Sequence, residues 1–166
     1  NSIQAPVCNS AVVGIKPTVG LVSRPGMVPL AITQDTAGPI ARTVRDAAIL
    51  LSAIVGSDPD DPMTLTGAFE ADYSAFCVSS ALVGARIGVA RRAFFGKEGK
   101  TEIDSVVESA VAAMRSDGAV IVDPADISTA EVVMPLASCV FRTDFKVGLN
   151  NFLARCCDRT AMRDMR

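Results

Sequence analysis

The chain has 166 residues, of which 49% are hydrophobic and 20% are charged, a formal net charge of −2, and no histidine. This balance provides no basic surface of the kind that binds nucleic acid, and the apolar run 47–55 is too short to cross a membrane. Without histidine, neither a Ser-His-Asp triad nor a Cys-His pair can be built from these residues. A serine nucleophile would need another base, and lysine is the main alternative.

The first part of the chain is punctuated by glycine and proline, which is typical of loops. We expect segments 16–26 and 34–43 to be mostly loop. A short strand or buried turn is expected at 11–15, and a brief extended piece at 27–32.

A helix is expected to begin after Thr43, whose hydroxyl can accept from the backbone N–H of Asp46 while Asp46 reciprocates in a capping box. Apolar residues then recur at three- and four-residue spacing as far as Val55, and Gly56 suits the position after the helix. The acidic stretch 58–62 follows. It lacks the glycine and the distal glutamate of an EF-hand loop, so we interpret it as a solvated turn rather than a calcium site.

The second half of the chain predicts a βαβ unit. Residues 85–90 and 119–123 read as strands, and 100–118 as a helix that Thr101 and Asp104 cap. Strand, helix and strand at this spacing imply a parallel pair in a covered sheet.

The two remaining segments are less regular. Residues 63–83 are expected to be loop with a helical turn, and 128–156 have helical periodicity that we expect to break near Pro135. Arg91 and Arg92 could hold an anion, but a paired arginine after a strand is usually surface.

The cysteines point to a reducing compartment. There are five (Cys8, Cys77, Cys139, Cys156 and Cys157), an odd number without a C-x-x-C pair, so neither a zinc site nor a disulfide framework is expected. We therefore expect buried free thiols and a cytoplasmic location.

Three phrases of the sequence form an ordered set. SIQAP at 2–6 is followed by GIKPTVGLVSRPG at 14–26 and by DTAGPIARTVRDAA at 35–48. Together they resemble the amidase signature family, and TDFKVGLNNFLA at 143–154 resembles a further phrase of that family. The resemblance implies an α/β fold with a mixed sheet covered by helices on both sides. It also implies that residues 1–166 are one partial amidase domain, central to C-terminal and truncated at both ends.

The resemblance also implies residue roles. Ser2 matches the acylating serine, and the backbone N–H of Asn1, with that of Ser2, matches part of the oxyanion hole. Gln4 and Ala5 lie close enough to Ser2 to bind substrate, and Pro6 stiffens the turn. The expected partner is a small-molecule amide, with no cofactor, metal, nucleic acid or membrane, and with a homodimer left open.

Other matching positions have supporting roles. Arg24, Asp35 and Arg42 are expected to fix loops around the site, and Lys16 is expected to be structural. Gln4 stands where the family often has arginine, which argues against a carboxylate-bearing substrate.

Two function classes stay open at this point. The first is an amidase. Subunits of tRNA amidotransferases share the family's signature, but no basic surface favours that variant here. In the family, a lysine base and a second serine precede the nucleophile, and neither phrase occurs in these residues, so we expect this chain alone to be inactive. The alternative is a non-catalytic remnant or pseudoenzyme with a structural or binding role.

Overall fold

The computed structural model describes residues 2–92, 102–156 and 164. The chain divides into two compact units, the first formed by Asn1–Cys77 with Ser138–Arg166 and the second by Val78–Ala137. Helices and two small sheets make this an α/β protein, as the sequence predicts.

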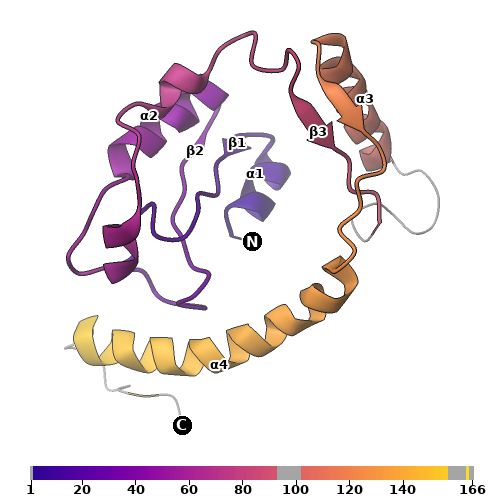
Figure 1. Ribbon diagram of the computed structural model, residues 1–166. Helices are drawn as coiled ribbons and strands as arrows, with labels where there is room; N and C mark the ends of the chain where they lie inside the picture. The colour runs from indigo at the N-terminus through magenta and orange to yellow at the C-terminus, as the bar shows by residue number, and fades with distance from the viewer. Residues whose placement is uncertain (1, 93–101, 157–163, 165–166) are drawn as a thin grey trace. The chain divides into compact units, whose positions relative to one another are not determined.

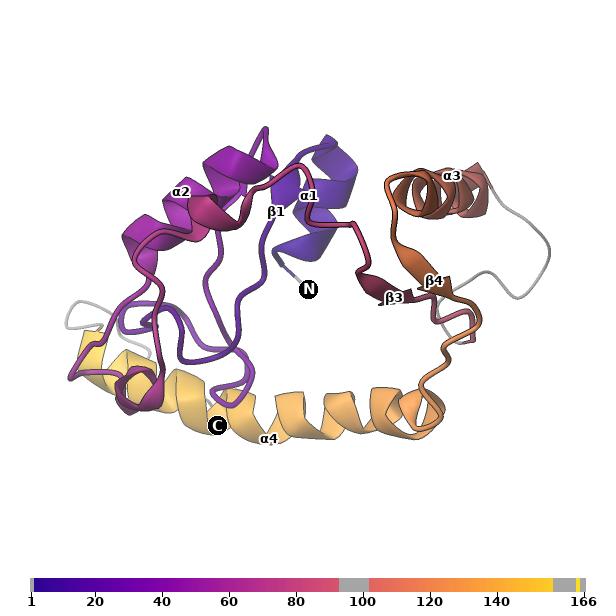
Figure 2. The ribbon, with the colours of Figure 1, turned by 45° about the horizontal axis from the view of Figure 1, so that its top comes forward.

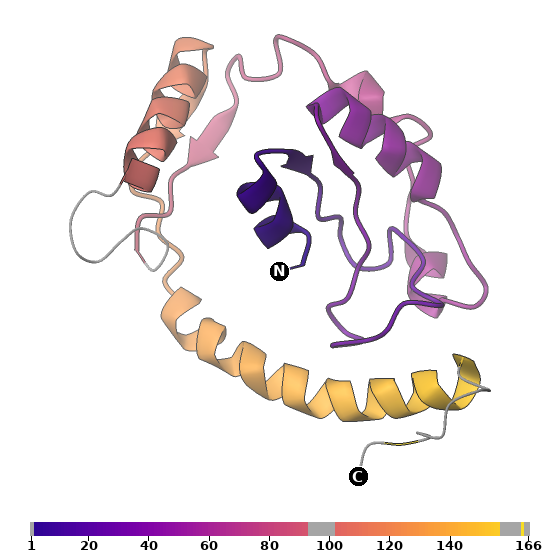
Figure 3. The ribbon, with the colours of Figure 1, turned by 180° about the vertical axis from the view of Figure 1, so that it is seen from behind.

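The first unit is built around a short antiparallel strand pair. Strand β1 (Val13–Gly14) pairs with β2 (Ile40–Ala41), and the views in Figures 1 and 2 place helix α1 (Gln4–Ser10) and helix α2 (Val44–Ile54) on opposite sides of this pair. Figure 3 shows the same arrangement from behind. Helix α1 contacts β1, and α2 contacts both strands.

Helix α2 confirms the predicted cap. The Thr43 hydroxyl accepts from the backbone N–H of Asp46 at 3.1 Å, which satisfies one of the free donors at the start of the helix. Ala47, Ala48 and Leu51 form its buried face. Two 3-10 helices follow, η1 (Pro62–Thr66) and η2 (Tyr73–Phe76), and these are the helical turn expected in 63–83.

The second unit confirms the predicted βαβ unit. Strand β3 (Arg86–Gly88) pairs in parallel with β4 (Val120–Val122), and helix α3 (Glu102–Ser116) connects them and lies along β4. The helix ends before Gly118, whose φ of +94° is readily adopted only by glycine. Thr101, the expected cap, lies outside the described residues.

Helix α4 (Ala130–Cys156) continues through Pro135, so the expected break there is wrong. A proline inside a helix removes only one backbone hydrogen bond, and the turns on both sides can maintain the helix.

Three further segments differ from the expectations. Helix α1 forms where no element was predicted, and strand β2 lies within the segment 34–43, which was expected to be mostly loop. Residues 27–32 form no strand: the chain bends at 27 and 30, and the Asp35 carboxylate accepts from the backbone N–H groups of Leu30 and Ala31, at 2.8 and 2.9 Å.

The cysteine expectation holds only in part. Cys8, Cys77 and Cys139 are free thiols, but Cys8 and Cys139 are exposed and Cys77 is half-buried, so none of the three is fully buried. Cys157 lies outside the described residues. Among the helices of the described ranges, none is both long and apolar enough to span a membrane.

Candidate active site

Ser2 lies in an exposed turn immediately before α1. Ile3, the next residue, is the N-cap of the helix, and its carbonyl accepts from the backbone N–H of Val7 at 3.3 Å. The Ser2 side chain therefore lies at the surface. The start of the helix fixes the backbone of Ile3, the residue that follows Ser2. Asn1, expected to contribute a backbone N–H, lies outside the described residues.

Gln4 and Ala5 are the first two residues of α1, and both are exposed. Pro6 is the third helical residue, where a backbone N–H has no partner within the helix in any case, so proline is tolerated. Ser2, Gln4 and Ala5 are thus all exposed within one short stretch at the start of α1.

Among the described residues, the Lys16 ammonium forms no hydrogen bond with a serine hydroxyl. Lys16 follows β1 by two residues, is exposed, and donates from Nζ to the carbonyl of Pro17 at 3.2 Å. This contact within a loop agrees with a structural role.

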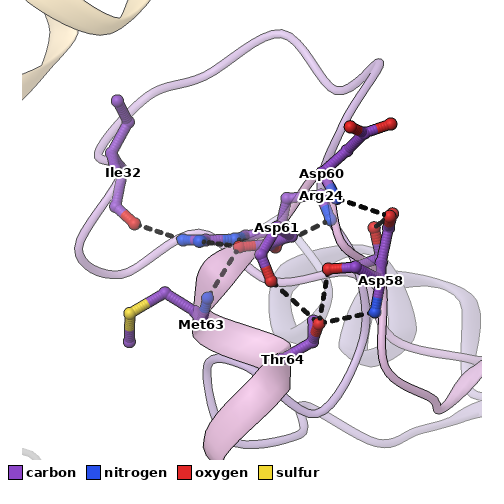
Figure 4. A network of polar contacts seen from close by, with 8 residues as sticks. Arg24, Ile32, Asp58, Asp60, Asp61, Met63 and Thr64 are labelled. Atoms are coloured by element: carbon purple, nitrogen blue, oxygen red, sulfur yellow. Dashed lines mark hydrogen bonds and ion pairs between the residues drawn. The ribbon is translucent and has the colours of Figure 1, made fainter.

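Arg24, which is half-buried, and Asp61, which is buried, form an ion pair that joins two loops of the first unit (Figure 4). Arg24 donates from Nη2 to Asp61 Oδ1 at 2.6 Å and from Nε to Oδ2 at 2.8 Å, and its backbone N–H donates to Oδ2 at 3.1 Å. Its Nη1 donates to the carbonyl of Ile32. Hydrogen bonding to Arg24 lowers the pKa of the Asp61 carboxyl, and the same bonds raise the pKa of Arg24.

Asp61 is only 3% exposed, so interpreting the whole 58–62 stretch as a solvated turn is wrong for this residue. The carboxylate caps η1, and Thr64, which is fully buried, donates to the Asp61 carbonyl at 2.8 Å and accepts from the backbone N–H of Asp58 at 2.7 Å. Asp60 remains exposed, and the described part of the chain contains no cluster of acidic, cysteine or histidine side chains suited to a metal ion. The acidic stretch is a structural junction.

The other two residues expected to support the site differ from each other. Asp35 is half-buried and organises the turn at 30–31 through the bonds described above, whereas Arg42 is exposed. Sequence reasoning identified the loop-fixing roles of Arg24 and Asp35 but missed Asp61. The sequence did contain a signal for this cap: Asp61 directly precedes Pro62, and an aspartate followed by a proline is typical of the start of a helix.

A cleft of about 530 Å³ also lies within the first unit. Its lining includes Arg24, Met27, Asp35, Phe152 and Arg155, but not Ser2, Gln4 or Ala5. The cleft is thus a separate feature from the serine turn.

In the second unit, Arg91 and Arg92 are engaged by carboxylates. Arg91 pairs with Glu108 and Asp123, and Arg92 pairs with Glu131 at 3.0 Å. Hydrogen bonding to Arg91 lowers the pKa of Asp123. These acidic partners disfavour the anion-binding interpretation and favour the structural one.

By fold the chain is an α/β protein, and Ser2 is an exposed residue on the turn before α1. The family model described as Amidase matches residues 1–165. The chain therefore belongs to the amidase family.

Individual relatives agree with this assignment. An Arabidopsis thaliana protein named a probable amidase is 36% identical over 159 residues, which cover 92% of this chain and 29% of the relative. One glutamyl-tRNA(Gln) amidotransferase subunit, from Microcystis aeruginosa, is 45% identical over 120 residues, or 72% of this chain and 24% of that protein. The chain thus spans less than a third of the length of these curated relatives.

Solved structures show the same fold. The native peptide amidase of Stenotrophomonas maltophilia matches with a TM-score of 0.85 and 37% identity, covering 98% of this chain and 32% of that one. The described residues therefore form part of the amidase signature fold.

Proposed function

We propose that this protein is an amidase that hydrolyses a carboxamide C–N bond through an ester formed on Ser2, and that residues 1–166 are part of one amidase domain. Family membership supports the reaction class. The observation that argues for Ser2 is its exposed position on the turn before α1, in the phrase that matches the family's nucleophile.

In the proposed reaction, Ser2 Oγ attacks the amide carbonyl carbon. The C–N bond then breaks, the nitrogen leaves as ammonia or an amine after taking up a proton, and the acyl group remains as an ester on Ser2. Water attacks this ester, releases the carboxylic acid and returns a proton to Ser2 Oγ. No metal or other cofactor takes part in these steps.

Backbone N–H groups stabilise the negative charge that develops on the carbonyl oxygen. We assign this role to the N–H groups of Asn1 and Ser2, and one such donor contributes about 3 kcal/mol to the transition state. Gln4 and Ala5, exposed on the first turn of α1, contact the acyl part of the substrate.

Residues 1–166 in isolation are proposed to be inactive, because neither the family's lysine-base phrase nor its Gly-Ser-rich phrase is among them. The free thiols Cys8, Cys77 and Cys139 support a reducing location such as the cytoplasm.

The experiment measures the rate at which the intact protein releases ammonia from a panel of carboxamides, including peptide C-terminal amides. Ser2→Ala is expected to abolish release. Ser10→Ala is the matched control, since Ser10 is the exposed last residue of α1, and it is expected to leave the rate unchanged. Equal rates for Ser2→Ala and wild type would exclude Ser2 as the nucleophile.

A second candidate is a component of a tRNA-dependent amidotransferase, which the relatives named as glutamyl-tRNA(Gln) amidotransferase subunits favour. The two functions differ in one measurement. We expect an amidotransferase component to release ammonia from glutamine faster when glutamyl-tRNA(Gln) is present, whereas the rate of a free-standing amidase should not respond to that RNA.

A further inference from the structure

The geometry points to Ile3 as a positioning residue for Ser2: its side chain, seated against Gly14 and Gly38, fixes the turn that presents the serine hydroxyl. This inference rests on the proposed function, because it concerns how the same serine is held. All of the residues concerned belong to the first unit.

The first contact surface is Gly14 of β1. A Cβ atom at Gly14 would stand 3.3 Å from Ile3 Cγ2 and 2.6 Å from Val7 Cγ1. The side chains of Ile3 and Val7 therefore already occupy the space in which any larger residue at position 14 would place its first carbon. Since Ile3 is the N-cap and Val7 lies four residues on, both ends of the first turn of α1 rest on this glycine.

The second contact surface is Gly38, which precedes β2. A Cβ atom there would stand 2.9 Å from Ile3 Cδ1 and 2.1 Å from the carbonyl oxygen of Ile15. The backbone N–H of Ile15 donates to the carbonyl of Pro39 at 3.1 Å, and β1 pairs with β2 through Gly14 and Ile40. The two glycines are thus held by one hydrogen-bonded framework, and Ile3 contacts both.

The identity of the cap residue supports this role. Helix N-caps are usually Ser, Thr, Asp or Asn, because their side chains accept from free backbone N–H groups. Ile3 cannot do so, and α1 has no side-chain cap hydrogen bond. Apolar contact with a hydrogen-bonded strand pair therefore replaces the polar cap in fixing the point at which the chain enters α1, one residue after Ser2.

The test is the rate of reaction of the intact protein with a fluorophosphonate. In this reaction Ser2 Oγ bonds to phosphorus, the P–F bond breaks, fluoride leaves and the serine proton passes to solvent. We expect Ile3→Ala to lower the maximal inactivation rate about tenfold or more, with the inhibitor's half-saturating concentration unchanged, because a displacement of about 1 Å at a reacting group can cost about a hundredfold in rate. Ile3→Val, which lacks only the methyl that reaches Gly38, should fall in between.

Leu51→Ala on α2 is the matched control. Leu51→Ala and Ile3→Ala remove the same number of carbon atoms, but Leu51 lies on the buried face of α2 rather than beside Ser2. At a temperature where both variants are folded, Leu51→Ala should leave the inactivation rate unchanged. A rescue adds a second readout. Gly14→Ala should slow the reaction by forcing Val7 aside, and adding Val7→Ala, which removes the atom 2.6 Å from the new Cβ, should restore it.

The outcomes separate this inference from the proposed function. Labelling of Ser2 that slows in Ile3→Ala but not in Leu51→Ala, together with the rescue, supports the inference. Labelling of Ser2 at the wild-type rate in Ile3→Ala overturns it while the proposed function stands. Labelling that persists in Ser2→Ala overturns the proposed function and this inference with it.

Discussion

The ion pair between Arg24 and Asp61 should make the stability of the first unit sensitive to the loss of the arginine, because the Asp61 carboxylate would then be left buried without a cation, and Arg24→Met tests this. The substitution keeps an apolar stem in place of the arginine but removes both charge-assisted bonds to a carboxylate that is only 3% exposed. Breaking a buried pair by removing one partner costs about 3–5 kcal/mol, because the remaining charge is left without compensation. Two backbone N–H groups, from residue 24 and Met63, still reach the carboxylate, so we expect a loss of about 3 kcal/mol, the lower end of that range.

The assay is urea denaturation of the intact protein followed by circular dichroism. Arg45→Met is the control, because Arg45 is exposed on α2, and surface substitutions usually change stability by less than about 0.5 kcal/mol. A loss for Arg24→Met as small as that for Arg45→Met would refute the reasoning.

The same pair predicts a pH dependence. The pKa of Asp61 is lowered in the folded state, so its contribution is fully present above the ordinary pKa of a carboxyl group and is lost as the pH falls through the lower folded value. The stability difference between wild type and Arg24→Met should therefore narrow in acid. A difference that stays constant down to the acid limit of folding would contradict this assignment.

Two further predictions concern backbone geometry. Thr43→Ala removes the acceptor for the N–H of Asp46 and should cost about 1 kcal/mol, seen as a lower midpoint of thermal unfolding, and an unchanged midpoint would count against the cap. Gly20→Ala and Gly26→Ala form a matched pair, because both glycines have a positive φ, +89° at Gly20 and +86° at Gly26. They differ in the space available: a Cβ at Gly20 would stand 2.4 Å from the carbonyl oxygen of Met63, whereas a Cβ at Gly26 would meet no atom within 4 Å. We expect Gly20→Ala to be more destabilising by about 1–3 kcal/mol, and equal losses in urea denaturation would rule out that contact.

The sequence predicted best where local chemistry decides the structure. The Thr43 cap follows from a side-chain pattern within one element, and each helix and strand of the βαβ unit follows from its own periodicity; all of them are present. It predicted poorly where contacts between distant segments decide. Strand β2 exists only because Ile40 and Ala41 meet β1, and Asp61 is buried only because Arg24 reaches it from another loop.

The candidate site shows the same division. The position of Ser2 could be read from its phrase, because the phrase is a local pattern. The contact of Ile3 with Gly14 and Gly38 could not, because those glycines lie on two later segments whose pairing the sequence does not reveal.

The most direct test of the account is to trap the covalent intermediate. The intact protein is mixed with an activated amide, quenched in acid within its first turnover, and analysed by mass spectrometry with peptide fragmentation. We predict a mass increase equal to the acyl group, located on Ser2 and absent from Ser2→Ala. An acyl group on any other residue, or amide turnover without an acylated protein, would contradict the claim that Ser2 forms the ester.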